Sequence, residues 1–131
     1  MDKIGVVGLG NVGNAVRIGF ESKGYEVLSY DNSKNCNSSL PELAARCDFV
    51  FICVPTPTGP GGQDLTILDE VMDSLAEYIP VKTHWDSIHS TVKHVLVIKS
   101  TVIPGTCDNY ATKWQDLPIV YNPEFHRSRD G

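Results

Sequence analysis

The feature that most constrains the fold of this chain is a short apolar run that leads directly into a glycine-rich turn. Residues 3–13 read KIGVVGLGNVG, and residues 4–7 within them are typical of a buried strand. The turn follows the pattern G-x-G-x-x-G, in which Gly8 permits a tight bend. Gly10 lets the backbone approach a pyrophosphate, and Gly13 lets the next helix pack closely on the sheet. The pattern predicts a strand, turn and helix that cradle a phosphate.

The residues after the turn continue as a helix. Residues 14–20 are predicted to be helical because apolar side chains recur at helical spacing, at Val12, Val16 and Phe20. The free N–H groups and the positive dipole end of this helix would hold the phosphate. We expect Gly24 to end the helix at its C′ position.

A second strand then ends on an acidic residue. Residues 25–30 are predicted to form this strand, and Asp31 follows about twenty residues after the glycines. A carboxylate there can accept hydrogen bonds from the hydroxyls of an adenosine ribose; alternatively, Asp31 only opens the turn with Asn32 and Ser33. The full order of strand, turn, helix, strand and acid favours the ribose. Because a carboxylate repels a 2′-phosphate, NAD is favoured over NADP, a preference that Lys34 could soften.

The composition excludes several other classes of protein. The chain has 131 residues and a formal net charge of −5, and its only group of basic residues is the pair Arg127 and Arg129, so we expect no nucleic-acid partner. No apolar stretch reaches the roughly eighteen residues of a membrane helix. Met1 leads into Asp2 and the first strand without room for a signal peptide. We therefore expect one cytoplasmic domain with no membrane partner.

The cysteines and histidines give little sign of a disulfide framework or a metal centre. The four cysteines include no C-x-x-C pair, so we interpret them as free thiols. Cys53 lies in an apolar run and is expected to be a buried small hydrophobe. Cys107 could be an inert thiol or a thiolate stabilised near a helix start. The histidines at 84, 89 and 94 could bind zinc, but their spacing matches no familiar ligand set, so a surface connection is the better interpretation.

Strand and helix patterns alternate through the rest of the chain. The predicted strands are residues 48–54, 95–100 and 118–121. Helices are predicted after a capping box of Ser39 and Glu42, from Asp64 or Thr66 to Tyr78, and from Pro104 onward. The intervening loops are residues 32–39, 55–63 and 81–94. This alternation predicts an α/β fold in a single domain, with one doubly wound, mostly parallel sheet (Rossmann-like) and a ligand cleft at the carboxyl ends of its strands.

The candidate functional segments all follow predicted strands. They are residues 8–13, 31, 54–58, 100–102 and 122–125. Since the carboxyl ends of parallel strands meet at one edge of a sheet, these segments should border the same crevice. The hydroxyls of Ser100 and Thr101 could project into that crevice or only cap the next turn.

Four segments, in this order, resemble the N-terminal domain of the UDP-glucose/GDP-mannose dehydrogenase family. They are IGVVGLGNVG at 4–13, CVPTPT at 53–58 with Asp64-Leu65 after it, KSTVIPGT at 99–106, and YNPEF at 121–125. The first is common to many nucleotide-binding folds, whereas the other three are specific. In this family the full enzyme oxidises the C6 alcohol of a nucleotide sugar to a carboxylate in two NAD-dependent steps, through a thiohemiacetal on a catalytic cysteine.

The resemblance implies a role for each matching residue. The pyrophosphate would lie against Gly8, Gly10, Asn11, Val12 and Gly13, and the adenosine ribose against Asp31. The cofactor channel would be lined by Val54, Pro55, Thr56, Ser100 and Thr101. Thr101 would also position a catalytic water beside the nicotinamide, and Glu124 would support proton transfer during thioester hydrolysis. These two are the candidate catalytic residues, and no metal is implied.

Two departures from the family pattern define the functional alternatives. The family has a second glutamate four residues after Glu124, where this chain has Ser128. The chain also stops at Gly131, where the family continues into a central helix and a C-terminal substrate domain with the nucleophilic cysteine. One hypothesis is the cofactor half of an NAD-dependent enzyme, inactive until a substrate domain or partner subunit supplies the nucleotide-sugar site. The other is a stand-alone dinucleotide-binding module without catalysis.

Overall fold

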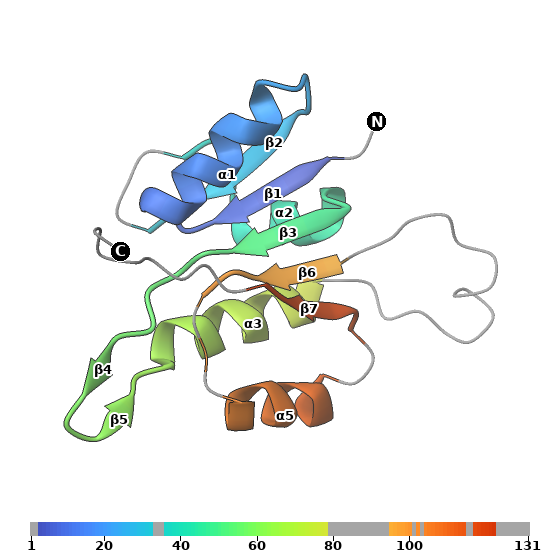
Figure 1. The fold of residues 1–131 in the computed structure, drawn as a ribbon. Coiled ribbons are helices and arrows are strands. Elements are labelled where there is room, and N and C mark those ends of the chain that lie inside the picture. Colours follow the sequence, from blue (N-terminus) through green and yellow to red (C-terminus); the bar gives the residue numbers. More distant parts are fainter. Residues whose placement is uncertain are drawn as a thin grey trace, which may run out of the picture.

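The computed structural model describes residues 3–32, 36–78, 95–100, 102, 104–114 and 117–122. Its main element is a five-stranded sheet flanked by helices (Figure 1). The strands are β1 (Ile4–Val7), β2 (Val27–Tyr30), β3 (Phe49–Ile52), β6 (Val95–Ile98) and β7 (Ile119–Tyr121). The helices are α1 (Asn11–Glu21), α2 (Leu40–Arg46), α3 (Thr66–Tyr78) and α5 (Pro104–Lys113). A separate antiparallel pair consists of β4 (Thr58–Gly59) and β5 (Gly62–Gln63).

All neighbouring strands of the main sheet are parallel, in the order β2-β1-β3-β6-β7. The predicted α/β fold with a doubly wound, parallel sheet is therefore confirmed. The chain crosses from β1 to β2 on one side and later to β3 on the other side, so the strand order reverses at β1. At the carboxyl ends, Val7 pairs with Tyr30 of β2 and with Ile52 of β3. Open α/β sheets bind ligands outside the strand ends at such a switch point.

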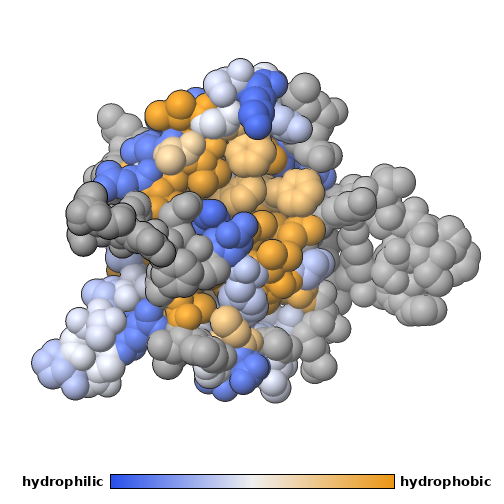
Figure 2. Space-filling view, viewed as in Figure 1, coloured by the Kyte–Doolittle hydropathy of each residue, from blue (hydrophilic) through white to orange (hydrophobic). Residues whose placement is uncertain are grey.

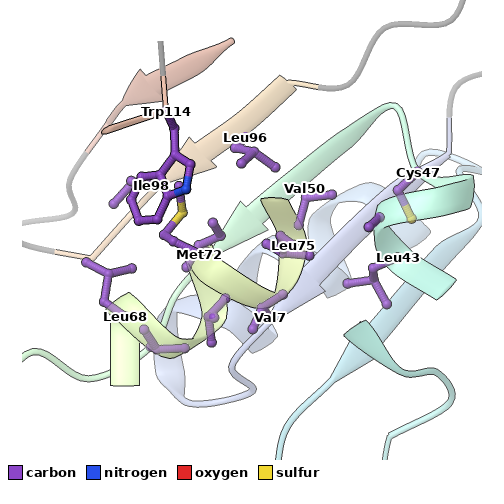
Figure 3. Packing of buried hydrophobic residues seen from close by; sticks show 14 of the residues in the cluster. Val7, Leu43, Cys47, Val50, Leu68, Met72, Leu75, Leu96, Ile98 and Trp114 are labelled. Carbon is purple, nitrogen blue, oxygen red and sulfur yellow. The ribbon is translucent and has the colours of Figure 1, made fainter. Parts of the chain in front are cut away.

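The described helices cover the two faces of the sheet and bury its strands. On one face Phe20 of α1 packs against a cluster that includes Ile4. On the opposite face α2, α3 and α5 enclose a larger core, in which Leu43, Met72 and Trp114 meet the strands (Figure 3). Burial on both faces explains why the parallel strands are near-continuous apolar runs. No helix in the described ranges is both long enough and apolar enough to cross a membrane.

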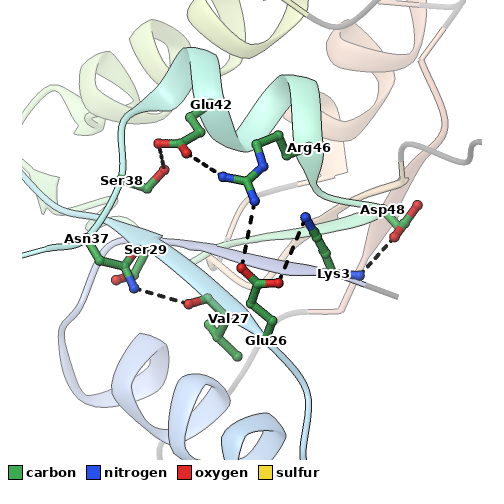
Figure 4. Close-up of polar contacts among 9 residues, drawn as sticks. All are labelled: Lys3, Glu26, Val27, Ser29, Asn37, Ser38, Glu42, Arg46 and Asp48. Carbon is green, nitrogen blue, oxygen red and sulfur yellow. Dashed lines mark hydrogen bonds and ion pairs between the residues drawn. The ribbon is translucent and has the colours of Figure 1, made fainter. Parts of the chain in front are cut away.

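The outer edge of β2 is covered by one side chain of the segment that follows it. The Oδ1 atom of Asn37 accepts a hydrogen bond of 2.8 Å from the backbone N–H of Ser29, and its Nδ2 atom donates to the carbonyl of Val27 at 3.3 Å (Figure 4). The side-chain amide thus takes the place of a neighbouring strand on this edge. It also fixes where the chain enters α2.

The start of α2 confirms Ser39 as the N-cap but not the reciprocal half of the predicted capping box. Ser39 Oγ accepts a hydrogen bond from the backbone N–H of Glu42 at 3.4 Å. The Glu42 carboxylate binds Ser38 Oγ at 2.8 Å and Arg46 at 2.6 Å instead (Figure 4). These contacts, Ser38 first, lower the pKa of Glu42.

Two local expectations concern turns. Gly24 ends α1 at C′, as predicted: the backbone N–H of Tyr25 donates to the carbonyl of Phe20 at 3.1 Å, and that of Gly24 donates to the carbonyl of Glu21 at 3.0 Å. These are the two bonds of a Schellman motif, and Gly24 has the left-handed φ of 89° that this position favours. The segment at residues 55–63 was expected to be a loop without a helix or a central strand; it contains neither, but it includes the short β4/β5 pair, for which Gly62 supplies a φ of 109°. This pair projects from the body of the molecule, and its surface is hydrophilic (Figures 1 and 2).

Of the two candidates for capping α3, the structure selects Asp64. Its Oδ1 atom accepts a hydrogen bond of 2.9 Å from the backbone N–H of Thr66, which is the first residue of the helix. Hydrogen bonds from the side chain and then from the backbone N–H of Thr66 lower the pKa of Asp64. The helix is described up to Tyr78, as predicted, whereas the three histidines considered for zinc lie outside the described residues.

Candidate cofactor site

A cleft of about 630 Å³ lies at the carboxyl ends of β1, β2 and β3. It lies at the topological switch point, where the fold predicts a ligand. Its volume falls within the range of about 300–1,000 Å³ that is usual for small-molecule sites. The residues that line it are Val7, Gly8, Gly10, Tyr30, Asp31, Asn32, Leu40, Cys53, Val54, Pro55, Ile67, Glu70, Val71 and Ser74.

The three glycines of the turn are needed for different reasons. Gly8 has φ of 93°, and a Cβ atom there would lie 2.6 Å from the carbonyl oxygen of Cys53. A Cβ atom on Gly13 would lie 1.7 Å from the carbonyl oxygen of Gly8, so any side chain would separate the helix from the turn. Gly10 has an ordinary extended backbone, and a Cβ atom there would meet no atom of the described residues within 4 Å. The folded chain itself therefore requires Gly8 and Gly13, but not Gly10.

The N-terminus of α1 carries no side-chain cap. Gly10 is the N-cap residue, no side chain caps the helix, and no acidic residue occupies the first turn. The positive end of the helix dipole is therefore not neutralised by the first turn, an arrangement that suits an anion. Asn11 and Val12 are the first two helical residues and border this end of the cleft without being among the residues that line it.

The Asp31 carboxylate reaches across to the glycine turn. It follows β2 directly, and its Oδ2 atom accepts a hydrogen bond of 2.6 Å from the backbone N–H of Leu9. The carbonyl of Tyr30 accepts a second bond, of 2.8 Å, from the backbone N–H of Gly8. These two bonds join the end of β2 to the turn and place a carboxylate on the wall of the cleft. Neither interpretation of Asp31 from the sequence predicted the contact with Leu9.

The segment after β3 forms another wall. Val54 and Pro55 line the cleft, whereas Thr56, which is half-buried, does not. Ser100, at the end of β6, is 7% exposed, and its hydroxyl donates a hydrogen bond of 2.7 Å to the carbonyl of Val54. Ser100 therefore supports the backbone of Val54, which lines the cleft, without lining the cleft itself. Direct contact of Thr56 or Ser100 with a cofactor stays a prediction.

The two candidate catalytic residues, Thr101 and Glu124, lie outside the described residues, as does Lys34. Their proposed roles rest on the sequence alone.

The sequence did not reveal the helical walls of the cleft. Leu40 comes from α2, and Ile67, Glu70, Val71 and Ser74 come from α3. The α3 residues recur at helical spacing, which was visible in the sequence. The packing of α3 on the sheet decides which face of the helix lines the cleft. A local sequence pattern does not predict that packing.

The cysteines show no sign of a nucleophile. All four are free. Burial raises the pKa of Cys47 to about 12, and burial together with Asp108 raises the pKa of Cys107. A raised pKa opposes thiolate formation, so it favours the inert interpretation of Cys107. Cys53 is half-buried and lines the cleft, so it is less enclosed than expected. Within the described residues, no group of three histidine, cysteine or acidic side chains could hold a metal ion.

Comparison with known proteins points to one family. The sequence model of the UDP-glucose/GDP-mannose dehydrogenase family, NAD binding domain, matches residues 33–130. The model of the D-isomer specific 2-hydroxyacid dehydrogenase NAD binding domain matches residues 1–61. A curated relative, UDP-N-acetyl-D-mannosamine dehydrogenase from Pyrococcus horikoshii, is 27% identical over 145 residues, which cover 88% of this chain and 32% of the relative.

Two solved structures share the fold. GDP-mannose dehydrogenase from Pseudomonas aeruginosa has a TM-score of 0.76 at 23% identity, covering 95% of this chain and 36% of its own. UDP-glucose dehydrogenase from Pyrobaculum islandicum has a TM-score of 0.68 at 26% identity, covering 97% and 37%. The chain thus spans about a third of the length of these relatives. The resemblance seen in the sequence is confirmed: the chain belongs to the UDP-glucose/GDP-mannose dehydrogenase family and corresponds to its NAD-binding domain.

Proposed function

We propose that the cleft binds NAD with its pyrophosphate at the glycine turn and its adenosine ribose at Asp31. NAD is the cofactor of the matching family domain. The observation that carries the residue assignment is the hydrogen bond from the Leu9 N–H to Asp31, because it holds a carboxylate beside the turn on the cleft wall. The open space at Gly10 supports the same placement, since no residue in the described part of the chain fills it.

Each residue of the turn then has a physical task. Gly8 and Gly13 keep the turn tight, and Gly10 lets the pyrophosphate approach the N–H groups at the start of α1. Asn11 and Val12 contribute the first of these N–H groups. The Asp31 carboxylate accepts hydrogen bonds from ribose hydroxyls while it remains bound to Leu9, and its charge disfavours a 2′-phosphate.

We further propose that residues 1–131 form a single domain, the cofactor half of an NAD-dependent nucleotide-sugar dehydrogenase. Bound NAD would accept a hydride from the sugar C6 atom once a substrate domain or partner subunit supplies the sugar site. Thr101 and Glu124 are the proposed catalytic residues, and Thr56 and Ser100 complete the proposed channel. The named relatives act on UDP-linked or GDP-linked sugars, which supports a nucleotide sugar as the second ligand.

A second candidate is a dinucleotide-binding module without catalysis. It is favoured by Ser128, which replaces the second glutamate of the family pattern. Both candidates suit a cytoplasmic protein, since all four cysteines are free thiols.

Calorimetric titration of the 131-residue chain tests the proposal. We expect saturable binding of NAD, and we expect Asp31→Ala to weaken it by about 1–3 kcal/mol because a charged hydrogen-bond acceptor is lost. Asp108→Ala, which removes an exposed carboxylate on α5, is the matched control and should bind like the wild type. Absence of NAD binding to the folded wild type would refute the proposed function.

A turnover assay separates the two candidates. The chain is mixed with NAD and UDP-glucose or GDP-mannose, and NADH is followed by absorbance. We expect no turnover by the chain alone, and turnover once a substrate domain of a relative is added. NADH formation by the chain alone would exclude the non-catalytic module.

A further inference from the structure

The helix α3 presents a mixed polar and apolar strip to the cleft. Ile67, Glu70, Val71 and Ser74 all line it, at the i, i+3, i+4 and i+7 positions that share one side of a helix. The neighbouring side of the helix is in the core, where Leu68, Met72 and Leu75 are fully buried (Figure 3). Because that side is fixed in the core, the cleft strip is held in one orientation.

Other elements contribute apolar residues to the same cleft. Leu40, the first residue of α2, lines the cleft together with Tyr30 at the end of β2. Asn37, three residues before Leu40, binds the edge of β2. Val54 adds an apolar residue from the β3 side. The cleft therefore combines apolar lining residues with a few polar ones, Asp31 and Asn32 after β2 and Glu70 and Ser74 on α3, as is usual for small-molecule sites.

The proposed cofactor position directs its base into this slot. With the pyrophosphate at Gly10 and the ribose at Asp31, the base attached to that ribose enters the part of the same cleft lined by Leu40, Ile67 and Glu70. The polar residues of the α3 strip then face the edge of the base, and the apolar side chains that line the cleft face its rings. This step rests on the proposed function, since it uses the proposed positions of the phosphate and ribose.

The carboxylate of Glu70 is available for hydrogen bonds with the edge of the base. Glu70 is exposed, and its side chain makes no ion pair or hydrogen bond with the described part of the chain. An ionised carboxylate only accepts hydrogen bonds. On the edge of the purine that carries N7 and position 6, adenine presents an amino donor, whereas hypoxanthine or guanine presents only acceptors. Ser74, one helical turn further, has a hydroxyl that can donate to a ring nitrogen.

We propose that Glu70 is a specificity-determining residue that makes this site select a 6-aminopurine dinucleotide over a 6-oxopurine dinucleotide. The carboxylate attracts the amino group of the correct base and repels the oxygen of the other. Glu70 thus adds to Asp31 a second point of discrimination on the adenosine half of the cofactor.

The test compares NAD with nicotinamide hypoxanthine dinucleotide, which has an oxygen in place of the amino group at position 6 of the purine and a proton on N1. Dissociation constants for both are measured by calorimetry on the 131-residue chain, on Glu70→Ala and on Glu70→Gln. Glu77→Ala is the matched control, because Glu77 lies two turns further along the same helix, is exposed, and does not line the cleft. Glu70 and Glu77 are both exposed, so we expect all three variants to fold, which circular dichroism checks.

We expect the wild type and Glu77→Ala to bind NAD on the order of tenfold more tightly than the hypoxanthine analogue. In Glu70→Ala the ratio should fall to about one to threefold, and in Glu70→Gln it should also fall, because the amide can turn its nitrogen toward a 6-oxo group. If the wild type binds both dinucleotides equally, or if Glu70→Ala keeps the full preference, this inference is wrong while the proposed NAD site stands. If the wild type binds neither, both are wrong.

Discussion

Replacement of Gly10 by alanine should abolish tight NAD binding without destabilising the fold. The backbone at Gly10 has φ of −78° and ψ of −159°, and a Cβ atom there meets no atom within 4 Å in the part of the chain that the structure describes. Alanine adopts this extended conformation without strain. The substitution restricts the unfolded chain, which stabilises the folded state by about 0.4–1 kcal/mol. Alanine is also a poorer N-cap than glycine, which destabilises the folded state by a similar amount. We therefore expect the free energy of unfolding of Gly10→Ala to lie within about 0.5 kcal/mol of the wild type.

The effect on the ligand should be much larger. The new methyl group would occupy the space through which the pyrophosphate approaches the start of α1. We expect NAD affinity to fall at least tenfold, or about 1.4 kcal/mol. Urea denaturation followed by circular dichroism gives the stability, and calorimetry gives the affinity.

Gly13→Ala provides the contrast within the same turn. Its Cβ atom would lie 1.7 Å from the carbonyl oxygen of Gly8, so the backbone has to move. We expect a loss of stability of about 3 kcal/mol. The reasoning is refuted if Gly10→Ala binds NAD like the wild type, or if Gly13→Ala is as stable as Gly10→Ala.

Three other predictions concern stability and titration. Asn37→Ala should lower the free energy of unfolding by about 1–2 kcal/mol in urea, since both hydrogen bonds to the β2 edge are lost; Asn109→Ala on the exposed side of α5 is the control, and equal losses would contradict the account. Burial raises the pKa of Tyr121 to about 12, so the unfolded state should lose this proton first, and stability present below pH about 10 should decline toward pH 12. Constant stability over that range, measured by urea titration, would contradict it. Cys36 is exposed and should react with a thiol reagent at pH 8, whereas Cys47, whose pKa burial raises to about 12, should react only after unfolding; rapid reaction of both in the native state would be incompatible with this packing.

The elements of the main sheet could be predicted because each is a local pattern. The apolar run at residues 49–52 and the helical spacing of Val16 and Phe20 are visible without any partner, and both elements form where expected. The β4/β5 pair was missed because its four residues are two glycines, a threonine and a glutamine, and strands of two residues leave no periodic signal.

The site was predictable to a lesser extent. The glycine turn and Asp31 follow from spacing, and the cleft contains both. The bond between Leu9 and Asp31 was not predictable, because it depends on how the ends of β1 and β2 align. The place of Glu70 in the cleft was not predictable either. In the sequence, an acidic residue on a helix has the same pattern whether the helix borders a cleft or only solvent. Long-range packing, not residue type, decides such cases.

The most direct test of the central claim is the response of backbone amides to NAD, followed by ¹H–¹⁵N nuclear magnetic resonance on the 131-residue chain. The account predicts saturable shifts that are largest at Gly10, Asn11 and Val12, with a further shift at Asp31. Amides of α5, on the far side of the core, should remain unchanged. Saturable shifts confined to another part of the chain, or no shifts at all, would contradict the placement of NAD at the glycine turn.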